Sequence, residues 1–280
     1  MFRLCLKSIE SQFILQSLCF SNTFASKRTM RFCVNINTVF QDIPNHINKY
    51  EEVLKRKDFT FDAIEDGNPY ERSLEEWTQF LAKVPTLKWV LINSLPLWDH
   101  YSHNTPDCQQ FQLFLQQTAD YVKTLNVSKV HLLLKDIKND SEIPKMRELI
   151  SFGARYLQPL GVMCVIEPLS IRPNYYLRSY DLAKQLVQEI NQPNVKLMLD
   201  TYHLQKLHGN ITQYIEALKP YIGHIQVSQV PLRDCPINEG EINHNYVLKQ
   251  ISQVYDDYVG LEYINKSDDS FEWLNKFKKL

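Results

Sequence analysis

The sequence predicts a single (β/α)8 barrel that spans residues 30–280. The chain has 280 residues, and a barrel of this kind typically takes about 250. From Arg31 onward, eight short runs of β-branched and aromatic residues alternate with amphipathic helical stretches. Successive runs begin 27 to 42 residues apart. An open, doubly wound sheet is the alternative fold, but eight regular units over this length favour closure.

The eight predicted strands are nearly continuous apolar runs, as expected for parallel strands that are buried on both faces. They occupy residues 31–37, 59–65, 87–93, 129–134, 162–167, 195–200, 222–227 and 257–262. No linker separates these units, so a second domain is not expected.

Signals for helix N-termini lie between the strands. Ser73-Leu-Glu-Glu76 is a capping box that opens a helix. Thr105-Pro106 combines an N-cap with proline at the first helical position, ahead of a helix to about Thr124. The remaining signals are Ser179 or Asp181 for a helix to residue 190, and Asp269 or Ser270 for a last helix over 271–280.

Residues 1–29 differ from the rest and are left out of the barrel. They carry four basic residues, five serines and the single acid Glu10, which is typical of a mitochondrial transit peptide. Met30 stands directly before the first strand, so an extension upstream of an alternative start is a second interpretation, and a structural N-terminal segment is a third. Polar residues interrupt the apolar stretch, which disfavours a secretory signal. We therefore expect a cytoplasmic or mitochondrial protein.

Composition excludes several classes of protein. The net charge is −1, from 31 Lys+Arg and 32 Asp+Glu, which disfavours a nucleic-acid partner. No apolar run approaches the roughly 20 residues of a membrane span. Glycine is scarce, and neither GxGxxG nor GxxxxGK occurs, so no nucleotide cofactor is expected. The six cysteines form no CxxC pair and are expected to be isolated thiols.

Polar residues stand where the predicted strands end, which is the face that carries the active site in such barrels. The strand ends are Glu65, Asn93, Glu167, Asp200, Gln226 and Glu262, with His203 three residues past Asp200 and His131 inside the fourth strand. Two carboxylates about 4 Å apart repel by roughly 4 kcal/mol at an effective dielectric of 20. A cation or a shared proton relieves that repulsion. The oxygens of Glu167, Asp200, Gln226 and Glu262 suit Mg²⁺ or Mn²⁺.

Each of these residues also has an ordinary structural interpretation. A lone acid at a strand end is more often a helix cap or a salt-bridge partner. His131 is compatible with a buried core histidine, and His203 with a helix cap. The joint pattern of six polar ends on one rim is what favours a functional site.

At these residues the chain resembles the hydroxypyruvate isomerase family, within the xylose isomerase-like TIM barrels. The resemblance covers nearly all of residues 30–280. The matching segments are 165–169 (VIEPL), 199–205 (LDTYHLQ), 223–227 (GHIQV), 230–233 (VPLR), Pro236, 240–243 (GEIN) and 260–263 (GLEY), with weaker matches at Glu65 with Pro69-Tyr70, at Asn93 with Pro96, and at Val130-His131.

The resemblance implies an isomerase for a small hydroxy-carbonyl substrate. Hydroxypyruvate and 2-hydroxy-3-oxopropanoate would interconvert through an enediolate, with Glu167 and Glu262 transferring the proton. The implied metal ligands are Glu167, Asp200, Gln226 and Glu262, and the implied substrate contacts are His203 and Arg233, with Glu65, Asn93 and His131 as weaker matches.

The chain departs from the family pattern at Ser170, where asparagine is usual, and at Ser228 and Gln229, where Ala-Asp is usual. Lys135 also stands where strand 4 usually ends in small residues. These departures leave alternatives open: a ketose 3-epimerase of the same superfamily, or an inactive small-molecule binder. An abasic-site endonuclease is disfavoured by the few rim histidines and the net charge. The sequence makes no prediction of oligomeric state.

Overall fold

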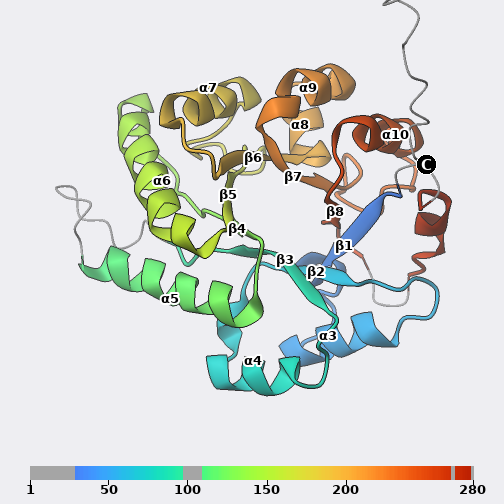
Figure 1. The fold of residues 1–280 in the computed structure, drawn as a ribbon. Helices are drawn as coiled ribbons and strands as arrows, with labels where there is room; N and C mark the ends of the chain where they lie inside the picture. Colours follow the sequence, from blue (N-terminus) through green and yellow to red (C-terminus); the bar gives the residue numbers. More distant parts are fainter. Residues whose placement is uncertain (1–28, 97–108, 266–268, 279–280) are drawn as a thin grey trace, which may run out of the picture.

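The computed structural model describes residues 29–96, 109–265 and 269–278, and it confirms the predicted barrel. Eight parallel strands pair in sequence order and close between the first and the last (Figure 1). The strands are β1 (Arg31–Asn35), β2 (Ala63–Asp66), β3 (Lys88–Asn93), β4 (Lys129–His131), β5 (Met163–Ile166), β6 (Val195–Asp200), β7 (Ile222–Val227) and β8 (Tyr258–Leu261).

Two strands, β2 and β4, are each three residues shorter than predicted, for different reasons. Residues 59–62 precede β2 instead of belonging to it, because Phe59 and Phe61 pack edge-on or tilted against other rings outside the barrel. The fourth strand ends at His131 because the amide of Leu133 donates to the Ser94 hydroxyl at 3.0 Å instead of to the neighbouring strand. This early end brings His131 to the rim.

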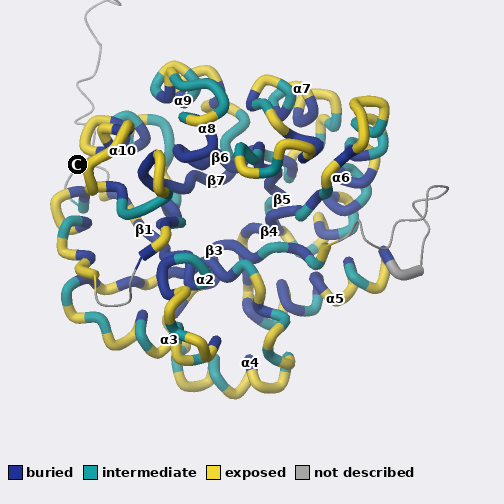
Figure 2. Tube along the Cα trace, turned by 180° about the vertical axis from the view of Figure 1, so that it is seen from behind, coloured by how far each residue is buried: buried dark blue, intermediate teal, exposed yellow. Residues whose placement is uncertain are grey.

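Helices surround the barrel and cover the strands. They are α2 (Ile36–Val39), α3 (His46–Lys55), α4 (Leu74–Leu81), α5 (Gln109–Leu125), α6 (Ile143–Leu157), α7 (Tyr180–Ile190), α8 (Thr201–Leu207), α9 (Ile211–Leu218) and α10 (His244–Val254), with 3₁₀ turns η1 (Pro69–Glu71), η2 (Asp140–Glu142), η3 (Gln158–Leu160), η4 (Lys219–Tyr221) and η5 (Glu272–Lys276). Figure 2 shows the strands buried and the outer helix faces exposed. Within the described residues, none of the helices has the length and apolar character needed to cross a bilayer.

The helix signals have three outcomes. The capping box is present, since Ser73 and Glu76 bond reciprocally at the start of α4, and Ser179 caps α7. The last helix is wrong: up to residue 278, where the description ends, the chain forms only the 3₁₀ turn η5, and the amide of Glu272 at its start donates to the Ser270 hydroxyl at 3.1 Å. The Thr105-Pro106 signal and nearly all of the 1–29 extension lie outside the described residues and stay predictions.

Side chains along each strand point alternately outward, into the layer between the barrel and its helices, and inward, into the space enclosed by the strands. Phe32 of β1 packs outward against Phe59 and Trp273. Its neighbour Cys33 points inward, where its thiol donates to Glu65 of β2 at 3.1 Å. The space enclosed by the strands is therefore only partly apolar, and the polar groups in it lie directly behind the rim.

Candidate active site

Seven of the nine residues predicted for the site line one cleft at the carboxyl ends of the strands. They are Asn93, His131, Glu167, His203, Gln226, Arg233 and Glu262. The cleft has a volume of about 230 Å³. The other two predicted residues, Glu65 and Asp200, are fully buried and do not line it. The cleft therefore gathers side chains from β3 through β8 and from the loops that follow them.

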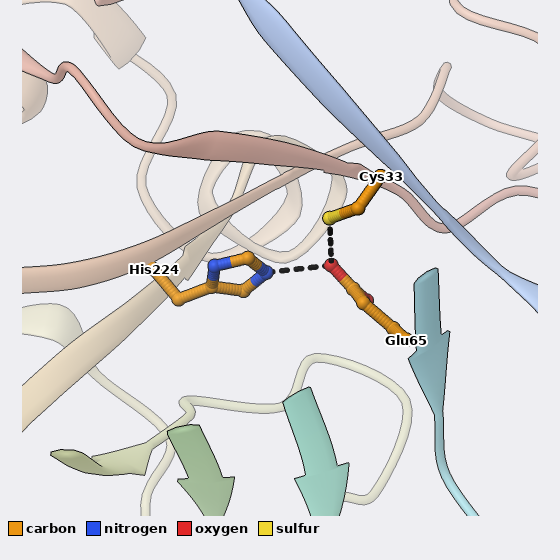
Figure 3. Close-up of side chains that lie close together, drawn as sticks. All are labelled: Cys33, Glu65 and His224. Carbon is orange, nitrogen blue, oxygen red and sulfur yellow. Dashed lines mark hydrogen bonds and ion pairs between the residues drawn. The ribbon is translucent and has the colours of Figure 1, made fainter. Parts of the chain in front are cut away.

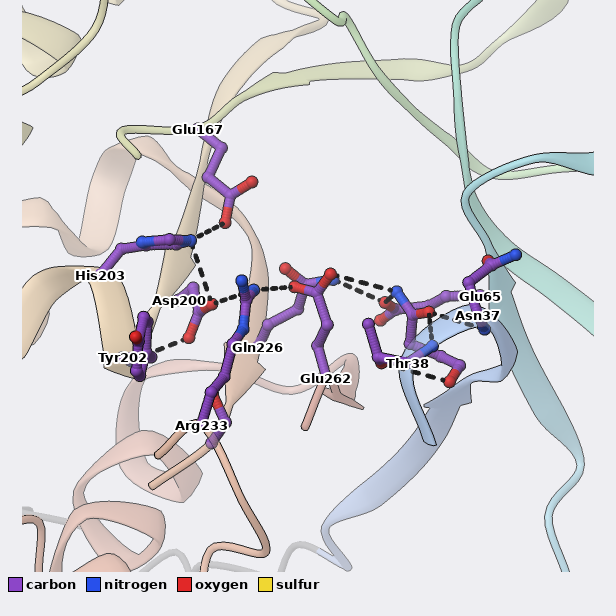
Figure 4. Close-up of polar contacts among 12 residues, drawn as sticks. Asn37, Thr38, Glu65, Glu167, Asp200, Tyr202, His203, Gln226, Arg233 and Glu262 are labelled. Atoms are coloured by element: carbon purple, nitrogen blue, oxygen red, sulfur yellow. Dashed lines mark hydrogen bonds and ion pairs between the residues drawn. The ribbon is translucent and has the colours of Figure 1, made fainter. Parts of the chain in front are cut away.

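Arg233 joins the acidic residues of the rim (Figure 4). Its Nη2 lies 3.0 Å from Asp200 Oδ2 and 2.9 Å from Glu262 Oε2. Nε of the same guanidinium is buried and has no hydrogen-bond partner among the described residues. Asp200 also begins α8, because its Oδ1 accepts the amide of Tyr202 at 2.8 Å. One cation thus holds two of the predicted metal ligands while one of its own donors stays unused.

The loop that carries Arg233 is held by a residue at which the chain departs from the family pattern. Gln229 is buried, and its amide bonds the backbone of Val230, Asn238 and Ile242. Arg233 itself has a positive φ of 56°. The departure at Gln229 therefore serves the loop's internal structure, which aims the guanidinium at the cleft.

The two glutamates predicted as acid and base have raised pKa values. Burial raises the pKa of Glu262 to about 8, with Arg233 opposing the rise and Asp200 adding to it. Burial, followed by repulsion from Glu262 and Asp200, raises the pKa of Glu167 well above its ordinary value. A carboxyl group whose pKa lies near neutral can both give and take a proton, which is the property that acid–base catalysis needs.

His203 is a buried, neutral imidazole. Its Nδ1 accepts the backbone N–H of Ser170 at 3.0 Å, and the Ser170 hydroxyl lies 2.8 Å from the same atom. The proton is therefore on Nε2, which lies 3.8 Å from Glu167 Oε1 and 3.7 Å from Asp200 Oδ2. Burial, reinforced by the charge of Arg233, holds the pKa of His203 well below its usual range. Its Nε2–H is free to donate to a substrate oxygen.

His131 and Asn93 form a second polar pair on the opposite side of Glu167. His131 Nδ1 lies 3.2 Å from Asn93 Oδ1, and Nε2 lies 4.0 Å from Glu167 Oε2. Burial lowers the pKa of His131 to about 3, so this imidazole is uncharged at neutral pH. Glu167 thus stands between two neutral histidines.

The residues present fit a divalent cation. Glu167 Oε1 and Gln226 Oε1 are buried acceptor atoms without hydrogen-bond partners in the described part of the chain. Carboxylate oxygens of Glu167 and Asp200 lie within 4.8 Å of each other, whereas His203, whose Nε2 carries the imidazole proton, is not a ligand in this arrangement. Buried polar groups are normally paired, so a cluster of unpaired ones favours a bound ligand. Carboxylate and amide oxygens favour Mg²⁺ or Mn²⁺.

The structure adds residues that the sequence reasoning missed. Asn35, Asn37 and Thr38, from the end of β1 and from α2, line the cleft beside Glu262. Asn35 Nδ2 lies 3.4 Å from Glu262 Oε1. The predicted first strand ran to residue 37, so Asn35 was not recognised as a strand end, although a polar residue there follows the same rule as the other six.

The chain belongs to the xylose isomerase-like TIM barrel family, whose model matches residues 55–277. Among solved structures, an AP endonuclease of family 2 from Brucella melitensis has a TM-score of 0.78 at 26% identity, and the match covers 88% of this chain and 98% of that one.

Two curated relatives are named as isomerases. A Danio rerio protein that bears the provisional name hydroxypyruvate isomerase is 29% identical over 268 residues, which cover 89% of this chain and 95% of the relative. The 2-oxo-tetronate isomerase of Pectobacterium atrosepticum is 28% identical over 257 residues, which cover 87% and 96%. These matches confirm the resemblance found in the sequence, and the chain is an isomerase of this superfamily.

Proposed function

We propose that this enzyme interconverts hydroxypyruvate and 2-hydroxy-3-oxopropanoate by moving a proton between neighbouring carbons through an enediolate. The observation that carries the proposal is the pair Glu167 and Glu262, a buried and a partly buried carboxyl group that line one cleft and both have raised pKa values. One of them removes the proton from carbon, and the other, or the same group after reorientation, returns it to the adjacent carbon.

The other residues bind and orient the substrate. Arg233 is the one cationic side chain that lines the cleft within the described residues, and its unpartnered Nε suits a substrate carboxylate. His203 donates its Nε2–H to a carbonyl or hydroxyl oxygen. A divalent cation, Mg²⁺ or Mn²⁺, held by Glu167, Asp200, Gln226 and Glu262, would stabilise the negative charge that develops on the substrate oxygens.

The size of the cleft favours a short substrate. Its volume of about 230 Å³ lies below the roughly 300–1,000 Å³ of sites for drug-sized ligands. A three- or four-carbon hydroxy acid is the class that fits best. The name of the Pectobacterium relative makes 2-oxo-tetronate the second compound to test.

Proton exchange tests the proposal directly. The full chain is incubated with Mn²⁺ or Mg²⁺ and hydroxypyruvate in D₂O, and deuterium at C3 is followed by NMR. We expect exchange that EDTA and Glu262→Gln both abolish. Exchange that survives EDTA would retain the glutamates and remove the metal from the proposal. Exchange only with 2-oxo-tetronate or with longer ketoses would change the substrate, and no exchange with any of them would support a binding protein instead.

A further inference from the structure

A chain of charged side chains crosses the inside of the barrel behind the cleft. Lys129 of β4 is 2% exposed, and its Nζ lies 2.8 Å from Asp257 Oδ2 and 3.1 Å from His224 Nδ1. His224 of β7 in turn lies 2.6 Å, through Nε2, from Glu65 Oε1. His224 and Glu65 are both fully buried. The four residues thus form one continuous path of polar contacts from Asp257 to Glu65.

The chemistry of lysine determines the direction of these hydrogen bonds. An ammonium group only donates, so His224 Nδ1 accepts from Lys129 and the imidazole proton is on Nε2. Nε2–H therefore donates to Glu65 Oε1, and the Cys33 thiol donates to the same oxygen at 3.1 Å (Figure 3). Cys33, Glu65 and His224 are grouped closely enough to suggest a metal site. The proton on Nε2 and the direct contacts between the three side chains exclude that interpretation.

The second oxygen of Glu65 faces the cleft wall. Glu65 Oε2 accepts Nε2–H of Gln226 at 2.6 Å. Because both Glu65 oxygens only accept, the amide of Gln226 has one orientation: Nε2 toward Glu65 and Oε1 away from it. Oε1 is buried, has no partner among the described residues, and belongs to a side chain that lines the cleft.

Gly260 of β8 supplies the space for this arrangement. A Cβ atom at position 260 would lie 2.0 Å from Glu65 Oε1 and 2.9 Å from Gln226 Cγ. Both side chains therefore occupy the volume that any other residue at position 260 would fill. The close fit of these two side chains to the glycine is a second observation, independent of the hydrogen bonds, that the Glu65–Gln226 pair has one defined position.

We propose that Glu65 is a positioning residue that turns the Gln226 amide so that its oxygen faces the cleft as a ligand for the divalent cation. This rests on the metal site of the proposed function and gives Glu65 a different part from the substrate contact that the resemblance implies. Lys129 and His224 stabilise the Glu65 carboxylate in the barrel centre, where an isolated charge is very unfavourable.

The variant Glu65→Gln tests the proposal because glutamine has the same shape as glutamate but replaces one of its two acceptor oxygens with an NH₂ donor. The amide at position 65 keeps its oxygen toward His224 and must present its NH₂ to Gln226. Gln226 then turns its own oxygen inward and its NH₂ toward the cleft. We expect Mn²⁺ affinity, measured by electron paramagnetic resonance without substrate, to fall roughly 10- to 100-fold.

A double variant separates orientation from general damage. In Glu65→Gln/Gln226→Glu the NH₂ at position 65 donates to a carboxylate at 226, whose second oxygen again faces the cleft. We expect its Mn²⁺ affinity to return to within about threefold of the wild type, a coupling between two contacting residues. Cys33→Ala is the matched control, because Cys33 contacts Glu65 Oε1, the oxygen that Gln226 does not use. Its Mn²⁺ affinity should stay unchanged.

The outcomes distinguish this inference from the proposed function. Unchanged Mn²⁺ binding in Glu65→Gln, or loss that the double variant fails to restore while circular dichroism shows a folded barrel, would overturn the positioning role and leave the isomerase proposal standing. Weaker binding that the double variant restores, in a protein that exchanges no substrate proton, would support the inference and remove the isomerase proposal. A wild type that binds no Mn²⁺ overturns the inference, and exchange in EDTA then decides the isomerase proposal separately.

Discussion

Charged residues are buried in two regions of this barrel: the mouth, which is the cleft with Glu167 and Glu262, and the centre, where Lys129, His224 and Glu65 lie behind it. The two regions differ in how these charges are paired. At the centre, Lys129 contacts His224 and His224 contacts Glu65. The electrostatic attraction of His224, followed by the hydrogen bonds from His224 and Gln226, outweighs burial, so that the pKa of Glu65 lies below its ordinary value. At the mouth, burial raises the pKa values of Glu167 and Glu262, and several buried polar atoms have no hydrogen-bond partner among the described residues. Buried charges that pair with one another stabilise a single structure, whereas buried polar atoms without partners remain available to bind a ligand.

The largest effect is expected at the centre, on stability. Lys129→Met removes the buried ammonium group that contacts Asp257 and His224, and Asp257, which is partly exposed, keeps Arg31 as its remaining cationic partner. Because the buried Nδ1 of His224 loses its lysine donor, we expect a loss of up to about 3 kcal/mol in free energy of unfolding. Urea denaturation of the metal-free protein measures it.

Lys88→Met is the matched control for this variant. Lys88 begins β3 as Lys129 begins β4, but its side chain is exposed, so we expect a change within about 0.5 kcal/mol. Equal effects of the two substitutions would mean that the central chain of charges contributes no more than a surface lysine.

The mouth should respond in the opposite manner, with lost activity and retained stability. Glu167→Gln removes a carboxylate that Glu262 and Asp200 repel, so the melting temperature should stay level or rise. Proton exchange should fall by a factor of roughly 100 or more, equivalent to about 2.7 kcal/mol in the barrier. Near-normal exchange, with the surface variant Glu189→Gln as the reference, would remove Glu167 from the reaction.

The raised pKa values at the mouth also predict how stability depends on pH. Between the ordinary glutamate pKa of 4.5 and the value of about 8 for Glu262, the folded protein binds more protons than the unfolded chain. Stability of the EDTA-treated protein should therefore fall as pH rises through this window, by up to ~1.4 kcal/mol per pH unit for each such proton. Urea melts at several pH values measure the slope. Glu262→Gln should reduce the slope, with Glu167 supplying what remains, and an equal slope in that variant would assign the protons elsewhere.

The contrast between the two regions also explains what sequence reasoning could find. The place of Glu167, Asp200 and Glu262 at the rim could be predicted because each follows an apolar run, and the parallel strands of a barrel end on one face. Lys129 and His224 lie 95 positions apart, and their contact depends on how the strands are staggered around the barrel, which local patterns do not encode. Asn35 was missed because apolar Ile36 follows it, so the strand was drawn two residues too long. The last helix was wrong because signals for a helix N-terminus, here Asp269 and Ser270, do not determine how the next residues fold: the described residues after them form a 3₁₀ turn whose N-cap, Phe271, has no side-chain cap.

The smallest effect is expected at Ser170, which holds the imidazole of His203 at the mouth. Ser170 contacts His203 Nδ1 through both its backbone N–H and its hydroxyl, so Ser170→Ala removes only one of two contacts. A neutral hydrogen bond contributes about 0.5–1.5 kcal/mol, and the remaining N–H still fixes the tautomer. We expect proton exchange to fall about threefold or less.

His203→Ala is the companion to this variant, because it removes the Nε2–H itself and should reduce exchange well beyond Ser170→Ala. If the two variants lost activity equally, the hydroxyl would be the essential group and the imidazole only its support. If Ser170→Ala raised KM while leaving kcat unchanged, His203 would act in binding the substrate, since a contact made equally in the ground and transition states affects KM alone. The split between KM and kcat therefore shows whether the unpaired donor at the mouth holds the substrate or assists the proton transfer.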